Sequence, residues 1–144
     1  MEPGGTIYEN DHWHLGTAIG SPVVWRGFLV IKLKRHCELI AELSSEVAPT
    51  LGPLIQSTCS ALTEAIKPAK VYVYSFSDGI KHVHFWVFPR PSGMRPGMHS
   101  VIFNLDMRTT LTRILGIKKW IVSDPDVNLI AKQVRDHLPQ RLNS

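Results

Sequence analysis

The alternating side chains of residues 80–88, IKHVHFWVF, constrain the fold of this chain more than any other feature of its sequence. The stretch is rich in β-branched and aromatic residues, which favours a β-strand. A second β-rich run, KVYVYSF at residues 70–76, precedes it, and only the turn residues SDG at 77–79 separate the two. So short a connection predicts an antiparallel hairpin.

The predicted strand presents two different faces, because successive side chains of a strand point to opposite sides. One face carries Lys81, Val83, Phe85 and Val87. The other face carries His82, His84, Trp86 and Phe88. The two imidazoles are therefore neighbours on one surface, and the indole of Trp86 is next in line.

Other segments predict further strands and the turns between them. Residues 16–36 are expected to form a strand, a turn and a strand, with Gly20, Ser21 and Pro22 in the turn and a β-rich run at 28–33. Residues 89–98, PRPSGMRPGM, predict a loop after the histidine-bearing strand.

Helical spacing of apolar residues appears in four places. It predicts a helix at 37–48, stopped by Pro49, a longer helix at 50–67, and a helix at 106–115. The long helix has one apolar stripe: Leu51, Leu54, Ile55, Thr58, Leu62, Ala65 and Ile66. The last helix begins at Asp124 and Pro125, residue types that suit a helix start. Its apolar face comprises Val127, Ile130, Ala131, Val134 and Leu138.

Composition limits the class of protein. The 144 residues, 44% hydrophobic and 19% charged, suit one soluble globular domain over residues 1–144. The formal charge of +4 favours anionic ligands, but no basic stripe with interleaved aromatic residues predicts nucleic-acid binding. No apolar run predicts a membrane span, and no signal peptide is evident. Two cysteines, Cys37 and Cys59, do not make a disulfide scaffold, so we expect a cytoplasmic protein.

Adjacent imidazoles permit two kinds of chemistry. A neutral imidazole is a nucleophile near pH 7, and a second ring can donate to a phosphoryl oxygen. Paired histidines can also bind a metal. His12 and His14 show the same spacing, which raises a zinc hypothesis together with His82, His84 or His99. No cysteine accompanies them, so surface or strand-edge polarity is the preferred interpretation of His12 and His14.

The stretch HVHFWVFPR resembles the signature of the histidine triad superfamily, His-φ-His-φ-His-φ-φ, which often ends in Pro-Arg. Residues 27–36, GFLVIKLKRH, and the SPVV turn at 21–24 resemble the segments that precede it in the family. SFSDG resembles the corresponding stretch of the fragile histidine triad branch. The similarity covers roughly residues 6–100, and residues 105–144 are a less typical helical C-terminal extension.

The resemblance implies an α+β fold, an antiparallel sheet with packed helices, and a homodimer. It implies nucleotidyl transfer or hydrolysis at the α-phosphate of a nucleotide or nucleotide conjugate, with no cofactor. In the family the middle histidine attacks phosphorus and forms a nucleotidyl-histidine intermediate, and here that position is His84. The first histidine, His82, would support the phosphate and orient His84.

Several family positions differ in this chain. The third histidine is Trp86, whose indole N–H donates one hydrogen bond but cannot shuttle a proton at pH 7. The ribose-binding position falls near Gly20 and the phosphate-contacting glutamine near Ser77. Arg90, in the Pro-Arg that closes the motif, is either a phosphate ligand or a solvated charge, as are Arg95 and His99. These changes leave a second hypothesis open, a non-catalytic nucleotide-binding or protein-interaction module.

Overall fold

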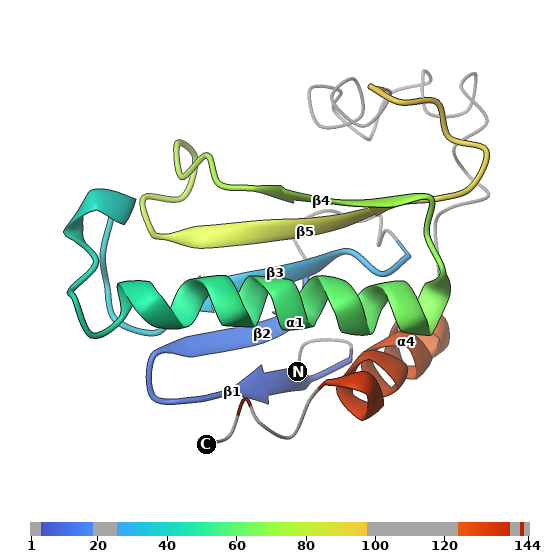
Figure 1. Cartoon of the computed structure of the whole chain (residues 1–144), viewed down its shortest axis with the longest axis horizontal. Coiled ribbons are helices and arrows are strands. Elements are labelled where there is room, and N and C mark those ends of the chain that lie inside the picture. The colour runs from blue at the N-terminus through green and yellow to red at the C-terminus, as the bar shows by residue number, and fades with distance from the viewer. Residues whose placement is uncertain (1–3, 19–25, 98–123, 139–141, 143–144) are drawn as a thin grey trace.

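Five antiparallel strands form one sheet in the computed structural model, which describes residues 4–18, 26–97, 124–138 and 142. The strands are β1 (Thr6–Glu9), β2 (Trp13–Thr17), β3 (Leu29–Leu33), β4 (Lys70–Tyr74) and β5 (His84–Arg90). They lie in the order β1-β2-β3-β5-β4 (Figure 1). With the helices α1 (Ala48–Ile66) and α4 (Asp124–His137), this confirms the expected α+β class.

The core lies on one face of the sheet. Val83, Phe85 and Val87 are buried there, so the predicted alternation of the histidine-bearing strand is confirmed. In the neighbouring strands the alternate residues Leu15 and Ile31 lie opposite each other and are 0% exposed. His84 and Trp86 therefore belong to the other face of the sheet, away from this core.

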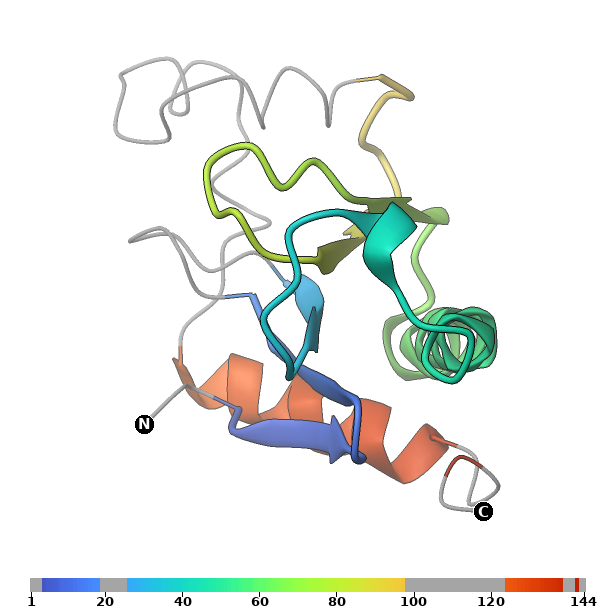
Figure 2. The ribbon, with the colours of Figure 1, turned by 90° about the vertical axis from the view of Figure 1, so that its left-hand side faces the viewer.

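Helix α1 confirms the prediction for residues 50–67, with a start two residues earlier, at Ala48. Leu54 and Leu62 are buried against the sheet, as the apolar stripe predicts. The helix ends where Lys67 adopts a left-handed conformation with φ of 47°, and its N–H donates to the Thr63 carbonyl. Pro53 lies inside the helix. Figure 2 shows α1 end-on beside the sheet.

The helix predicted at 37–48 is wrong. Only the short 3₁₀ helix η1 (Ile40–Glu42) forms, and the side chains of Leu39 and Ile40 are 59% and 48% exposed. The carbonyl of Cys37 accepts a hydrogen bond of 2.7 Å from the Val83 N–H, which draws this segment alongside the approach to β5. The apolar spacing was therefore misleading, because Leu43 and Val47 pack against the core whereas Leu39 and Ile40 do not.

The β4–β5 hairpin is confirmed, but its connection is longer than predicted. Strand β4 ends at Tyr74 and β5 begins only at His84 and continues to Arg90. Ser77 has φ of 56°, and the His82 N–H donates to the Ile80 carbonyl at 2.7 Å, so the chain turns here rather than running extended. His82 consequently precedes the strand in which it was predicted to lie.

Helix α4 confirms the predicted C-terminal helix. Val127, Ile130, Ala131 and Val134 are buried, and Leu138 packs against the same core. The helix packs against α1 and β1, and the Asn128 side chain accepts a hydrogen bond of 2.7 Å from the Gly4 N–H. Strand β1 had not been predicted. The turn expected at 20–22 and the helix expected at 106–115 lie outside the described residues.

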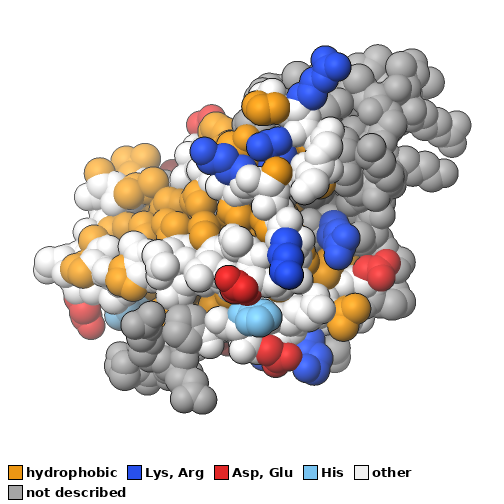
Figure 3. Space-filling model, turned by 45° about the vertical axis from the view of Figure 1, so that its right-hand side comes forward, with side chains coloured by type: hydrophobic (Ala, Val, Ile, Leu, Met, Phe, Trp, Pro, Cys, Tyr) orange, Lys and Arg blue, Asp and Glu red, His pale blue; other side chains and the backbone are white. Residues whose placement is uncertain are grey.

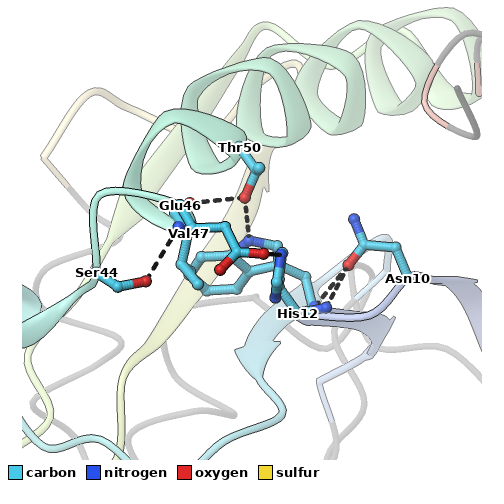
Figure 4. A network of polar contacts seen from close by, with 7 residues as sticks. Asn10, His12, Ser44, Glu46, Val47 and Thr50 are labelled. Atoms are coloured by element: carbon cyan, nitrogen blue, oxygen red, sulfur yellow. Dashed lines mark hydrogen bonds and ion pairs between the residues drawn. The ribbon is translucent and has the colours of Figure 1, made fainter.

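A polar network joins the β1–β2 turn to the start of α1 (Figure 4). The Asn10 side chain accepts hydrogen bonds from the backbone N–H groups of His12 and Trp13. The indole N–H of Trp13 donates to the Thr50 hydroxyl at 2.8 Å, and that hydroxyl donates to the Val47 carbonyl at 2.7 Å. The indole N–H of the fully buried Trp13 thus has a hydrogen-bond partner, and this bond links β2 to α1.

Candidate active site

A pocket of about 130 Å³ lies on the face of the sheet opposite the core. Val30, Lys32, His84 and Trp86 line it from β3 and β5, with His82 and Ile80 from the preceding loop. A larger pocket, of about 260 Å³, lies where α1 and β5 end, and Arg26, Lys67 and Ser92 supply its polar lining. Of these two pockets, the smaller one contains the paired histidines, so it is the candidate site for nucleophilic chemistry despite its size.

His84 is held in one tautomer by the backbone. Its side chain is buried, and Nδ1 lies 2.7 Å from the carbonyl oxygen of His82. A carbonyl oxygen can only accept, so Nδ1 carries the proton and donates it. In the neutral ring the lone pair is then on Nε2. The ring is oriented and its second nitrogen is available as a nucleophile or a base.

The ring of His82 is also hydrogen-bonded to the backbone, but through Nε2 rather than Nδ1. Its Nε2 lies 2.6 Å from the Leu33 carbonyl, to which it therefore donates. Its ring also lies beside that of the exposed His36, with ring centroids 5.9 Å apart. His82 thus bridges the end of β3 and the start of β5, and its own carbonyl fixes His84.

Two serine hydroxyls donate hydrogen bonds to the backbone carbonyls of the histidine pair. The Ser77 hydroxyl donates to the His82 carbonyl at 3.1 Å, the same oxygen that accepts from His84 Nδ1. The Ser75 hydroxyl donates to the His84 carbonyl at 2.9 Å. Ser77, predicted to bind substrate, is not among the residues that line the pocket. Its observed contact supports the orientation of His84.

Trp86 forms one wall of the pocket. Its ring centroid lies 5.1 Å from that of His84, with the two planes at 89°, and 5.1 Å from that of Phe28. The indole is half-buried, and Trp86 lies opposite Val30 in β3 and Tyr74 in β4. Burial, followed by the charge of nearby Tyr72, raises the pKa of Tyr74 to about 12, so its phenol stays neutral. The β4 side chain opposite Trp86 is thus uncharged.

Lys32 is a pocket residue that the sequence interpretation missed. It lies directly opposite His84 in the β3–β5 register and opposite His14 in the β2–β3 register. The sequence alone did not distinguish Lys32 from the nearby Lys34, which is exposed and forms an ion pair of 2.7 Å with Glu9. The alternation of residues 28–34 was the sequence signal that could have identified Lys32. It places Lys32 at the site only when β5 is known to pair with β3.

One predicted site residue, Arg90, is not brought to the pocket. Arg90 lies six residues beyond His84 on β5, about 20 Å away at the usual rise of a strand. Its Nη1 donates to the Met94 carbonyl at 2.5 Å. Gly20 lies outside the described residues. The roles predicted for Arg90 and Gly20 stay predictions.

The metal hypothesis gains no support from the histidine positions. His12 faces Glu46, with Nε2 and the carboxylate 3.9 Å apart, and His14 Nε2 lies 3.2 Å from the Thr6 hydroxyl. Within residues 4–18, 26–97, 124–138 and 142, no three His, Cys, Asp or Glu side chains are arranged to hold a metal ion. In the same residues, no helix has the length and apolar character needed to cross a bilayer.

Comparison of the fold with solved structures gives strong matches. A Hit-like protein involved in cell-cycle regulation from Bartonella henselae matches with a TM-score of 0.64 and 17% identity, over 92% of this chain and 85% of that one. A histidine triad nucleotide-binding protein from Sulfolobus tokodaii matches with a TM-score of 0.63 and 14% identity, over 92% and 82%. A uridylyltransferase matches with a TM-score of 0.60 and 19% identity, over 95% of this chain and 44% of that one.

Comparison at the level of sequence gives no such match. No protein-family model matches the chain. The search of curated proteins also found no match. The structural likeness therefore carries the assignment, and it establishes a histidine triad-like fold.

Proposed function

We propose that this protein is a nucleotidyl hydrolase or transferase that acts at the α-phosphate of a nucleotide derivative, with His84 as the nucleophile. The observation that carries this proposal is the hydrogen bond of 2.7 Å from His84 Nδ1–H to the His82 carbonyl. It leaves the lone pair of the neutral ring on Nε2, in a histidine that lines the pocket.

The proposed reaction has two steps. His84 Nε2 forms a bond to the α-phosphorus, and the bond from that phosphorus to the leaving group breaks. Water or another acceptor then attacks the same phosphorus, loses a proton to solvent or a base, and displaces Nε2 to release the nucleotide. Splitting one displacement into two easier steps is the general advantage of a covalent intermediate, and it requires no cofactor.

Each predicted site residue has a role in this proposal. His82 orients His84 through its carbonyl, and Ser77 stabilises that same carbonyl. Trp86 forms the wall on which a substrate group can stack. Gly20 and Arg90 are also proposed to contact substrate, Arg90 from the end of β5 away from His84.

A non-catalytic binding module is the second candidate function. The size of the pocket favours it, because about 130 Å³ is well below the roughly 300–1,000 Å³ of ordinary small-molecule sites. Trp86 fills space that a histidine would leave open. Saturable nucleotide binding with no product would support this candidate.

The decisive experiment compares wild type with His84→Ala and with the control His12→Gln, whose histidine lies away from the pocket. Each is incubated with adenosine phosphoramidate, a dinucleoside polyphosphate and a nucleoside diphosphate sugar, and nucleoside monophosphate is measured by chromatography. We expect release by wild type and His12→Gln, and a loss of at least about 10³-fold in His84→Ala. Acid quenching and mass spectrometry should detect the nucleotidyl adduct. Full activity in folded His84→Ala would refute the proposal.

We also propose that the protein forms a homodimer through the α1 and β4 side. Strand β4 is at the end of the strand order, and its Val73 is 37% exposed. Hydrophobic side chains gather on the side of the molecule drawn in Figure 3. An edge strand with apolar side chains is a surface that proteins usually cover. Sedimentation analysis should show a dimer that Val73→Lys shifts towards monomer, and a wild-type monomer would refute this.

A further inference from the structure

The larger cavity, on the opposite face of the sheet from the histidine pair, has the features of a second binding site. We propose that this cavity of about 260 Å³, where α1 and β5 end, binds a small phosphate monoester through Arg26, Lys67 and Ser92. The proposal is independent of the function proposed for His84, because it concerns other residues and another ligand.

The position of the cavity separates it from the histidine pocket. Pro89, which lines the cavity, lies on the same face of β5 as the core residues Phe85 and Val87, because alternate residues of a strand share a face. His84 belongs to the other face. It also lies five positions before Pro89 on β5, about 17 Å away at the usual rise of a strand. A small ligand in the cavity is therefore separate from His84.

The charged side chains of the cavity carry one sign. Arg26 and Lys67 line it, and no Asp or Glu is among its described lining residues. Of the ion pairs between described residues, none involves either cation. The carbonyl end of α1 opposes an anion, but its dipole amounts to about half an elementary charge, less than the charge of the two cations together. The cavity therefore favours an anion, and a doubly charged anion most strongly.

The polar groups of the cavity suit a phosphoryl group. The rest of its lining is apolar: Ile66, Pro68, Pro89 and Pro91. Proline has no backbone N–H, and the N–H of Lys67 already donates to the Thr63 carbonyl. The side-chain donors available to an anion are the Arg26 guanidinium, the Lys67 ammonium and the Ser92 hydroxyl. A guanidinium donates two parallel hydrogen bonds to phosphate oxygens, and a phosphate monoester carries about 1.5 to 2 negative charges at pH 7.

The frame of the cavity is fixed by contacts between segments that are distant in the sequence. The Ala69 N–H donates to the Arg90 carbonyl at 2.9 Å, which holds the residues after α1 against the end of β5. Gly27, with φ of +74°, lies so close to α1 that an added Cβ would be 2.6 Å from the Ile66 side chain. This close approach places the neighbouring Arg26 at the cavity. Because the frame is already formed, binding has a smaller entropic cost.

The volume of the cavity limits the size of the ligand. About 260 Å³ is just below the roughly 300–1,000 Å³ of ordinary small-molecule sites. A phosphoryl group with a few carbon atoms suits this volume better than a whole nucleotide does. The apolar lining can then contact the carbon atoms of the ester while the cations contact the phosphoryl oxygens.

The test follows the amide NMR spectrum of the isotope-labelled full chain during titrations at constant ionic strength. The probes are inorganic phosphate, methyl phosphate and, as a singly charged control, acetate. We expect both phosphates to produce saturable shifts at Gly27, Lys67 and Ser92, in His84→Ala as well as in wild type. Acetate should bind about fivefold or more weakly, because it carries a single charge.

Two charge-removing variants and a matched control test the ligands of the cavity. Arg26→Gln and Lys67→Gln should each weaken phosphate binding about fivefold, the upper range for an exposed ion pair. Lys70→Gln is the control, because Lys70 is an exposed lysine of β4 opposite Arg90 and does not line the cavity. It should leave the affinity nearly unchanged. The spread of the amide shifts verifies that each variant is folded.

The inference would be overturned if phosphate produced no saturable shift at Gly27, Lys67 and Ser92, or if acetate bound as tightly as phosphate. Equal affinity in wild type and in the double variant of Arg26→Gln and Lys67→Gln would also overturn it. Shifts confined to His84 and its neighbours would assign the phosphate to the histidine pocket instead, with the same consequence. The absence of His84-dependent turnover would refute only the function proposed for His84, because binding at this cavity does not depend on it.

Discussion

Replacing Thr50 by valine should destabilise the protein without affecting the pocket. The Thr50 hydroxyl accepts the indole N–H of Trp13 at 2.8 Å, and the Trp13 side chain is 0% exposed. Valine keeps the branched shape of threonine but leaves that buried N–H with no partner. An unsatisfied buried donor costs about 1–3 kcal/mol, more than the net value of the bond itself.

Urea denaturation followed by fluorescence would measure this loss, with two-state unfolding tested by a second probe. For a chain of this size each 1 kcal/mol lowers Tm by about 2–4 °C. The matched control is Thr63→Val in the same helix, because the exposed Thr63 hydroxyl donates only to the Cys59 carbonyl, at 2.7 Å. A Thr50→Val loss no larger than that of Thr63→Val would refute the reasoning. Activity below the unfolding transition should be the same in both variants.

Three further predictions concern the backbone, a thiol and the histidine pair. Gly27→Ala should lower the free energy of unfolding by about 1–3 kcal/mol, because Gly27 has φ of +74° and an added Cβ would lie 2.6 Å from the Ile66 side chain; an unchanged urea midpoint would contradict this. Burial raises the pKa of the Cys59 thiol. In a variant that lacks Cys37, the rate of Cys59 alkylation should therefore rise only at a higher pH than in the urea-unfolded protein, and coincident pH profiles would exclude the effect. Ser77→Ala should lower kcat several-fold with little change in KM, because the loss of one hydrogen bond to the His82 carbonyl costs about 1 kcal/mol. A change confined to KM would instead point to direct substrate binding by Ser77.

Local periodicity predicted several elements correctly, for an identifiable reason. The stripe on α1 and the apolar face of α4 repeat at helical spacing, and both faces are buried. Alternation in β5 separated the core residue Phe85 from the pocket residues His84 and Trp86. These features depend only on which side chains share a face, and that is decided by the geometry of a single element.

Local periodicity failed where a distant backbone competed with it. The segment at 37–48 has helical spacing, but Cys37 pairs through its carbonyl with Val83, and only η1 forms. No local rule anticipates this, because Cys37 and Val83 are far apart in the sequence and meet only when β3 and β5 pair.

The same distinction between local periodicity and tertiary contacts applies to the candidate site. The sequence by itself determined that His84 and Trp86 share a face, because period two is a property of any strand. Only the tertiary structure decided that Lys32 stands opposite His84, that Ser77 braces the backbone behind it, and that Arg90 lies at the far end of β5. The register between two strands and the course of a loop depend on contacts between distant segments, which one segment of sequence does not contain.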